Sequence, residues 1–298
     1  MSKSLGNFFT IREVTKLYHP LALRFFMMSA HYRSSINYSL EQLEVASVSV
    51  FSLYQTLRDS EEALLPFREK NSDGLVPKGK NVRITTEAQE GIDKLKDDFD
   101  AKMKDDLHTQ DFLNGALQEI LRLMNSTLNK LRKAKQQQPS LFLSLAEMEN
   151  AVKMVLDTLG LMSSSSYSEV LKQFKAKALT RAKLTEEYVL QQIELRAQAR
   201  KLKEFAKSDK IREDLEAKGI ALMDLGSETI WRPCARNLEV EGTEGIALLR
   251  ILKTVMTFIL SSWSSFSSFL MNRICRICSF IPFMGLADPR PAQQKKKE

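Results

Sequence analysis

Cysteine and histidine side chains are the first candidates for chemistry in this sequence, because both types bind metal ions. Cys275 and Cys278 are separated by two residues, which is the spacing of half a zinc site. Tetrahedral zinc needs four ligands, yet only Cys234 is left to join them and no histidine follows. The histidines are isolated from one another, at His19, His31 and His108. We therefore expect no metal site and interpret the histidines as structural.

Basic side chains suggest a second chemistry, which is binding to an acidic partner. The 298 residues include 44 Lys and Arg against 37 Asp and Glu, a formal net charge of +7. The excess is densest in residues 167–215. Such a charge suits nucleic acid, but a soluble protein that binds no nucleic acid can be equally basic, so both interpretations stay open.

Helices are the elements predicted to position these residues. Apolar residues recur at helical spacing in four stretches, at Leu40–Ser60, around Ile92, at Thr109–Leu131 and at Leu145–Leu159. A shorter helix should begin at Pro20 and carry Tyr32 on its apolar face, and Pro66 should open a polar linker. Antiparallel helices joined by short connections predict an all-α fold, with an up-and-down bundle over residues 19–162.

A small basic domain of helices and a β-ribbon is predicted to follow, over residues 163–233. It begins with the serine-rich linker 163–166 and continues as basic helices. Gly219 should end the last of them, and Ile220–Met223 with Thr229–Trp231 should form a hairpin. This ribbon would present one tryptophan near its end.

Five motifs resemble one family of enzymes. The opening MSKSLGNF is similar to the Lys-Met-Ser-Lys-Ser loop of class I aminoacyl-tRNA synthetases. Four more follow in the order expected of cysteinyl-tRNA synthetases, most of all the plant form: HPLALRFFMMSAHYRSSINYS (19–39), DDLHT (105–109), ARKLKEFAKSDKIREDLEAKGIALMD (199–224) and ETIWRP (228–233). The resemblance covers residues 1–233, and it corresponds to the part of that enzyme from the signature loop to the C-terminus.

The resemblance assigns the first loop to ATP. Formation of an aminoacyl adenylate places negative charge on the departing pyrophosphate, and a lysine on a mobile loop can meet that charge. By resemblance Lys3 is this residue, with Ser2 and Ser4 as hydrogen-bonding neighbours. Residues 1–18 are then a remnant of this loop with its connecting segment.

The resemblance also implies chemistry that this sequence does not contain. The Rossmann catalytic domain of the family, with its His-Ile-Gly-His motif and its zinc ligands, precedes the signature loop. No His-x-Gly-His occurs in these 298 residues. We therefore expect no cofactor in this chain, whereas the parent enzyme uses ATP with magnesium, and zinc. The chain should be the C-terminal, tRNA-binding part of a cysteine–tRNA ligase, either a fragment unable to activate cysteine alone or an incomplete sequence of the full enzyme.

The anticodon site is implied to lie on the ribbon. Trp231 and Arg232 correspond to the Thr-Trp-Arg element of the family, where a base can stack on the indole, and Asp224 could accept hydrogen bonds from a base edge. The alternative is that Trp231 closes a small core beneath the ribbon. Arg24 and Arg33 should lie near the inner corner of the tRNA or pair with local acids. Phosphate contacts, which position RNA without specifying sequence, are expected from Arg200, Lys203, Lys207 and Arg212.

Residues 234–298 do not share the resemblance. Thr254–Met271 lacks charge over nearly a bilayer span, but its six serines make it only moderately apolar. We interpret this tail as divergent and disordered, with a membrane segment as the minor alternative. The expected partner is cysteine tRNA, without an obligatory protein partner, and the expected compartment is the cytoplasm. A helical scaffold protein without RNA binding, anchored by its tail, is the second functional class.

Overall fold

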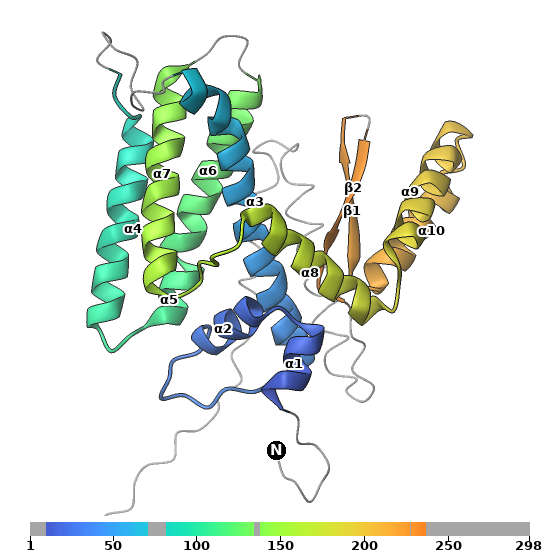
Figure 1. Ribbon diagram of the computed structural model, residues 1–298, viewed down its shortest axis with the longest axis horizontal. Coiled ribbons are helices and arrows are strands. Elements are labelled where there is room, and N and C mark those ends of the chain that lie inside the picture. The colour runs from blue at the N-terminus through green and yellow to red at the C-terminus, as the bar shows by residue number, and fades with distance from the viewer. Residues whose placement is uncertain (1–9, 71–81, 134–137, 227, 237–298) are drawn as a thin grey trace, which may run out of the picture. The chain divides into compact units, whose positions relative to one another are not determined.

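Figure 1 shows the computed structural model of the chain, which describes residues 10–70, 82–133, 138–226 and 228–236. The helices are α1 (Ile11–Leu17), α2 (Pro20–Met28), α3 (Leu40–Lys70), α4 (Thr86–Lys104), α5 (Thr109–Asn114), α6 (Ala116–Lys133), α7 (Pro139–Thr158), α8 (Tyr167–Ala182), α9 (Glu186–Lys201) and α10 (Phe205–Ala217). The strands are β1 (Ile220–Leu225) and β2 (Glu228–Pro233). The predicted all-α class is confirmed as a mostly helical chain with a two-stranded sheet.

Several predictions concern residues outside these ranges. They are the loop residues Ser2, Lys3 and Ser4, the pair Cys275 and Cys278, and the apolar stretch 254–271. Of the tail, only Cys234, Ala235 and Arg236 are described. Within the described ranges, no helix is both long enough and apolar enough to cross a membrane.

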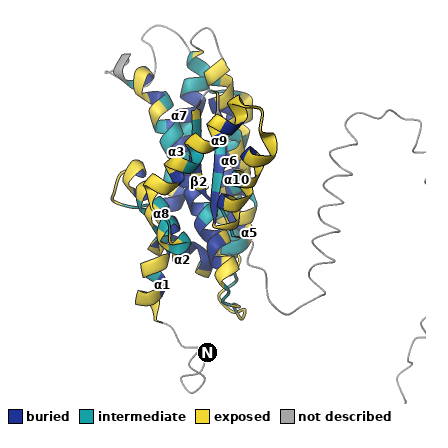
Figure 2. Cartoon of the chain, turned by 90° about the vertical axis from the view of Figure 1, so that its right-hand side faces the viewer, coloured by how far each residue is buried: buried dark blue, intermediate teal, exposed yellow. Residues whose placement is uncertain are grey.

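Four long helices, α3, α4, α6 and α7, pack against one another through an apolar core. On α6 the residues at helical spacing, Leu117, Ile120, Met124 and Leu128, are all buried, as their sequence pattern predicted. Figure 2 shows the buried residues inside the bundle, with exposed residues on the outer helix surfaces. Helices α1, α2, α5 and the first half of α8 add side chains to the same core.

The prediction that Pro66 opens a polar linker was wrong. Helix α3 continues through Pro66 to Lys70, well beyond the end expected at Ser60. Leu64 is fully buried, and the ring of Phe67 stacks on Phe142 of α7 with 5.1 Å between centroids. This packing against α7 stabilises the last turns of α3 despite the backbone hydrogen bond that proline removes.

Two other helix boundaries differ from the prediction. The helix expected over Thr109–Leu131 is broken at Gly115, where ψ is −108° and an added Cβ would lie 2.8 Å from the carbonyl oxygen of Asp111. Helix α2 does begin at Pro20, with His19 as its N-cap, but it ends at Met28. Tyr32 therefore lies outside the helix whose face it was predicted to share.

The predicted hairpin is confirmed, with longer strands than expected. The strands are antiparallel, with Leu222 opposite Trp231 and Asp224 opposite Thr229. Gly219, at φ +85°, marks the end of α10 as predicted, and it adopts a backbone conformation that other residues rarely take.

A second, smaller core joins the ribbon to helices α9 and α10. Its buried residues are Val189, Leu215, Ile220, Leu222 and Trp231. Leu179 and Ala182 of α8 pack against this cluster, while the first half of α8 belongs to the core of the bundle. Helix α8 thus contributes to both cores.

Candidate nucleic-acid interface

Asp224 fixes the end of α9 against the ribbon. Both nitrogens of the Arg196 fork donate to its carboxylate, from Nη1 to Oδ1 at 2.8 Å and from Nη2 to Oδ2 at 3.1 Å. Arg200 Nη1 donates to Oδ2 at 2.9 Å, and the Thr229 hydroxyl donates to Oδ1 at 2.8 Å. Forked arginine–carboxylate pairs of this kind fix orientation as well as distance. The ribbon residues next to the turn are therefore held beside the C-terminal half of α9.

These contacts change the role expected of Asp224. Hydrogen bonds from Arg196 and Thr229 hold the pKa of its carboxyl well below the ordinary range. Its oxygens already accept from three side chains, so in this arrangement it is not the free acceptor for a base edge that the sequence suggested. Asp224 instead positions Arg200, whose side chain is 49% exposed.

Trp231 closes a small core beneath the ribbon, as the alternative prediction stated. Its side chain is only 4% exposed and belongs to the core beneath the ribbon. The ammonium of Lys175 on α8 lies 4.7 Å from the centroid of the indole ring. A base could therefore stack on this indole only after the ribbon and α8 had separated.

The most exposed aromatic residue described in α9, α10 and the ribbon is Phe205, which was not predicted from the sequence. Phe205 begins α10 and is 60% exposed, and Leu202 in the preceding turn is 70% exposed. Both lie close in sequence to Arg200, which contacts the ribbon. The available signal was a single aromatic residue within the run RKLKEFAK. An exposed ring among cations is the combination that proteins use to bind single-stranded RNA.

The predicted phosphate-binding side chains largely surround this turn. Lys203 lies in the turn itself with φ +60°, and Lys207 Nζ is 3.4 Å from a carboxylate oxygen of Glu204. Arg212 on α10 and Arg232 on β2 are exposed, and neither forms an ion pair with any of the described residues. Arg200, Lys203 and Lys207 together make the vicinity of Phe205 basic.

Arg24 and Arg33 make contacts within the bundle instead. Arg24 Nε donates to the carbonyl oxygen of Leu159 at 2.8 Å. Arg33 Nη1 lies 3.1 Å from Asp106, and Arg33 Nε donates to the Tyr32 hydroxyl at 2.9 Å. Arg33 thus pairs with a local acid, as its alternative prediction stated, although its side chain is 69% exposed.

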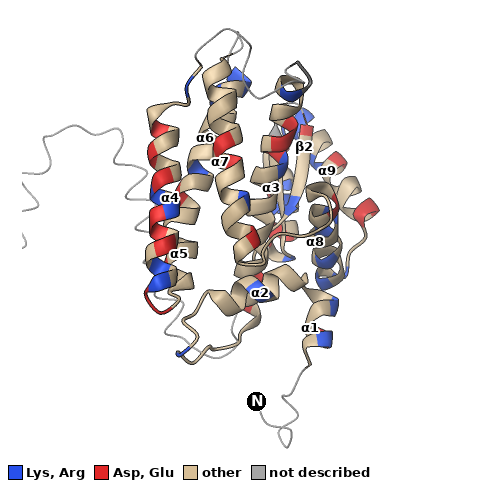
Figure 3. Ribbon diagram, turned by 60° about the vertical axis from the view of Figure 1, so that its left-hand side comes forward, with Lys and Arg blue, Asp and Glu red and all other residues tan. Residues whose placement is uncertain are grey.

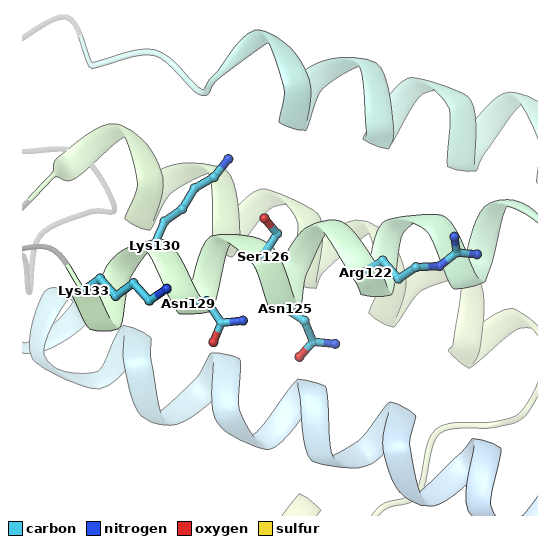
Figure 4. A pocket seen from close by; sticks show the side chains of 6 residues that line it. All are labelled: Arg122, Asn125, Ser126, Asn129, Lys130 and Lys133. Carbon is cyan, nitrogen blue, oxygen red and sulfur yellow. The ribbon is translucent and has the colours of Figure 1, made fainter. Parts of the chain in front are cut away.

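A second basic surface lies on α6, around a hollow of about 470 Å³ (Figure 4). Its lining residues are Arg122, Asn125, Ser126, Asn129, Lys130 and Lys133. Lys130 is paired with Glu87 at 3.1 Å, and Figure 3 shows many acidic residues along the neighbouring helix α4. Lys130 and Lys133 also lie in the last turn of α6, where they complement the helix dipole. No aromatic side chain of the described residues lines this hollow, so it is the weaker candidate for RNA.

The described residues do not fit a zinc ion. No group of three or more His, Cys, Asp or Glu side chains within them lies close enough to hold a metal. His19 accepts a hydrogen bond from the backbone N–H of Leu21 at its Nδ1 and stacks on Phe174. The rings of His31 and His108 lie 4.8 Å apart, centroid to centroid.

Replacing Asp224 with Asn should loosen the ribbon and the end of α9. The variant leaves Arg196, which is 4% exposed, beside a neutral amide, but the Asp224 side chain is 38% exposed and its charge is partly screened by water, so we expect a loss of about 1 kcal/mol in the free energy of unfolding at pH 7. Because folding lowers the pKa of Asp224, its stabilisation is complete above the ordinary pKa of about 3.8 and is lost as the pH falls below it. Urea unfolding at pH 7 and pH 3 should thus show a difference between wild type and variant that shrinks in acid. Equal stability at pH 7 would contradict the role of this pair.

Comparisons with known proteins agree with the resemblance. A family model described as the tRNA synthetases class I (C) catalytic domain matches residues 1–48. Over 233 residues the chain is 52% identical to a chloroplastic/mitochondrial cysteine–tRNA ligase of Oryza sativa subsp. japonica, covering 78% of this chain and 39% of that protein. Over 235 residues it is 51% identical to the cytoplasmic cysteine–tRNA ligase 2 of Arabidopsis thaliana, covering 78% and 45%. Over 232 residues it is 36% identical to the cysteine–tRNA ligase of Hydrogenovibrio crunogenus, covering 78% and 41%.

The chain spans about two fifths of the length of these relatives. Their names include both the cytoplasm and the chloroplast or mitochondrion, so they do not select one compartment for this chain. The match to plant enzymes extends over most of the chain at about half identity, and the class I match lies at its start. The chain is therefore a homologue of cysteine–tRNA ligases over 78% of its length, with a match to class I aminoacyl-tRNA synthetases at its start.

Proposed function

We propose that this chain is the C-terminal, tRNA-binding portion of a cysteine–tRNA ligase, and that the turn between α9 and α10 binds the anticodon end of cysteine tRNA together with the ribbon. The observation that carries this proposal is the exposed ring of Phe205 among cations, beside a helix end held to the ribbon by Asp224. The names of the relatives, which give cysteine and tRNA as what they join, support the choice of RNA.

In this site the residues have three different tasks. Phe205 offers a ring on which an unstacked base can lie, with Leu202 as an apolar neighbour. Arg200, Lys203, Lys207, Arg212 and Arg232 supply positive charge for phosphates. Trp231 acts indirectly, because its buried indole holds the ribbon in the position that presents this charge.

We propose further that cysteine activation belongs to the complete enzyme and that this chain cannot perform it alone. These 298 residues contain no His-x-Gly-His motif for ATP. By resemblance, Lys3 with Ser2 and Ser4 would contact ATP once the catalytic domain is present, and magnesium and zinc would be bound there. The proposed compartment is the cytoplasm, and the proposed RNA binding requires no membrane and no second protein.

The test is a titration of the full chain with a cysteine tRNA transcript and with a transcript altered only in its anticodon, each at two salt concentrations. We expect the native anticodon to bind more tightly, and both affinities to fall with salt because phosphate contacts release counterions. Phe205→Ala should weaken binding of the native transcript by about 1–3 kcal/mol, the typical contribution of one stacked base, and should reduce the anticodon preference.

A matched control uses the basic surface on α6. The double variant Arg122→Ala/Lys133→Ala removes two exposed cations from the hollow in Figure 4 and should leave the anticodon preference unchanged. Equal affinity for both transcripts would contradict anticodon reading by this chain. Absence of binding would favour the alternative, a helical scaffold protein without RNA binding.

A further inference from the structure

Helix α8 carries two cations that the proposed RNA site does not use. Lys177 Nζ donates to the carbonyl oxygens of Thr15 at 2.8 Å and Lys16 at 2.9 Å. Arg181 Nη1 donates to the carbonyl oxygen of Leu17 at 2.9 Å. The last carbonyls of a helix lack partners within the helix and form the negative end of its dipole. Side chains of α8 therefore provide the C-terminal cap of α1.

Arg181 is fixed in this position by further contacts. Its side chain is only 6% exposed, and its guanidinium carbon lies 4.4 Å from the centroid of the Tyr18 ring. Its Nε lies 3.8 Å from the carboxylate of Glu44 on α3, which is itself buried. A guanidinium so far removed from water is stable only where such partners surround it. The cap on α1 is thus a rigid feature of α8.

The same helix holds the ribbon. Lys175 lies over the ring of Trp231, and Leu179 and Ala182 pack against the small core of the ribbon. Figure 1 shows α8 running from the bundle towards the ribbon, with α1 beside it. Within two helical turns, α8 therefore contacts both the end of α1 and the underside of β2.

A second set of contacts joins the segment after β2 to the C-terminal end of α1. Arg236 follows β2, and its backbone N–H and its Nε donate to the carboxylate of Glu44 at 2.8 Å and 2.6 Å. Tyr18, at the C-terminal end of α1, donates its hydroxyl to Glu44 at 3.3 Å. Ribbon, α8 and α1 are thus joined through shared side chains.

We propose that α8 couples RNA binding at the ribbon to the stability of α1, with Lys177 and Arg181 as the positioning residues. This inference rests on the proposed function, since RNA is the ligand of the ribbon. Helix α1 has seven residues, and a helix of that length is not stable alone, so its population depends on the cap that α8 supplies. RNA that immobilises the ribbon also immobilises α8 and so strengthens the cap. Because such coupling is reciprocal, any stabilisation of α1 must in turn favour RNA binding at the ribbon.

Hydrogen exchange of the full chain, free and bound to a cysteine tRNA transcript, tests this coupling. We expect RNA to slow exchange of the α1 amides by about fivefold or more, the lower range of measured couplings between sites. Lys177→Met removes two of the three hydrogen bonds from α8 to the α1 carbonyls and should reduce this slowing, whereas Lys177→Arg should retain it, because arginine can still donate to the carbonyls. The control is Lys172→Met, which removes an exposed cation from the same helix and should behave as wild type.

A second arm needs no RNA. Trp231→Leu should loosen the ribbon and speed exchange of the α1 amides by about fivefold in the wild-type background, and by less in Lys177→Met, where two of the three hydrogen bonds from α8 to the α1 carbonyls are missing. If RNA protects the ribbon and leaves α1 unchanged, the coupling is overturned while RNA binding stands. If RNA protects nothing, the proposed function fails, and unchanged α1 exchange in Trp231→Leu would then overturn the coupling as well.

Discussion

Trp231→Ala should unfold the ribbon and loosen α9 and α10 while the bundle of α3, α4, α6 and α7 stays folded. Trp231 is 4% exposed, and among the described residues its core contains four other buried apolar side chains. Truncation of a buried tryptophan to alanine typically costs about 3–5 kcal/mol. That is a large fraction of the stability of a whole domain, and a core this small has few other contacts to compensate for it.

Hydrogen exchange resolves the two regions in one experiment. Amides in residues 186–233 should lose most of their protection in Trp231→Ala, whereas those of α4 and α7 should keep it. Trp231→Phe, which retains a ring beneath the ribbon and above Lys175, is the matched control and should remain close to wild type. We also expect the anticodon preference to disappear in the alanine variant and to persist in the phenylalanine variant.

The contrary result would be equally informative. If Trp231→Ala kept a protected ribbon and yet lost the anticodon preference, the indole would contact the base directly, as the resemblance first implied. Phe205→Ala provides the comparison, because its 60% exposed ring should be removable without any change in exchange at the ribbon. Trp231→Ala therefore tests which residue supports the ribbon, and Phe205→Ala tests which residue contacts RNA.

The bundle could be predicted from sequence because its information is local. The spacing of Leu117, Ile120, Met124 and Leu128 on α6 shows which face is buried, and all four are buried. Pro66 misled the prediction because its local tendency is to end a helix, whereas the packing of Phe67 on Phe142 joins residues far apart in the sequence. A single sequence does not show such a contact.

The elements that carry the candidate site could be predicted from the sequence, but the contacts of its side chains could not. The resemblance pointed to the ribbon and the basic helices, and the hairpin register confirms that Asp224 and Trp231 lie on paired strands. It could not show that Arg196, 28 residues before Asp224 in the chain, would already occupy that carboxylate. Phe205 was not predicted because a sequence does not show whether a single aromatic side chain is buried or exposed, and its 60% exposure is what distinguishes it.

Glu44→Gln should produce the second large effect, because it removes the charge at the centre of a buried network. Glu44 is 1% exposed and receives hydrogen bonds from Tyr18 and Arg236, with Arg181 Nε 3.8 Å away. Removal of one partner from a buried ion pair typically costs about 3–5 kcal/mol, since the other charge is left uncompensated. The Arg236 side chain is 23% exposed and can turn towards water, so we expect a loss near 3 kcal/mol in the free energy of unfolding, at the lower end of that range.

Urea unfolding followed by circular dichroism measures this loss, with Glu41→Gln as the control because Glu41 is an exposed acid near the start of the same helix. Equal stability of the two variants would show that the arginines around Glu44 find other partners.

If the loss is as large as expected, hydrogen exchange should show which segments lose stability. Glu44 is shared by α1, α8 and the segment after β2, so all three should exchange faster together in Glu44→Gln. A loss confined to Arg236 and its neighbours would mean that the cap provided by Lys177 and Arg181 holds α1 without help from the bundle.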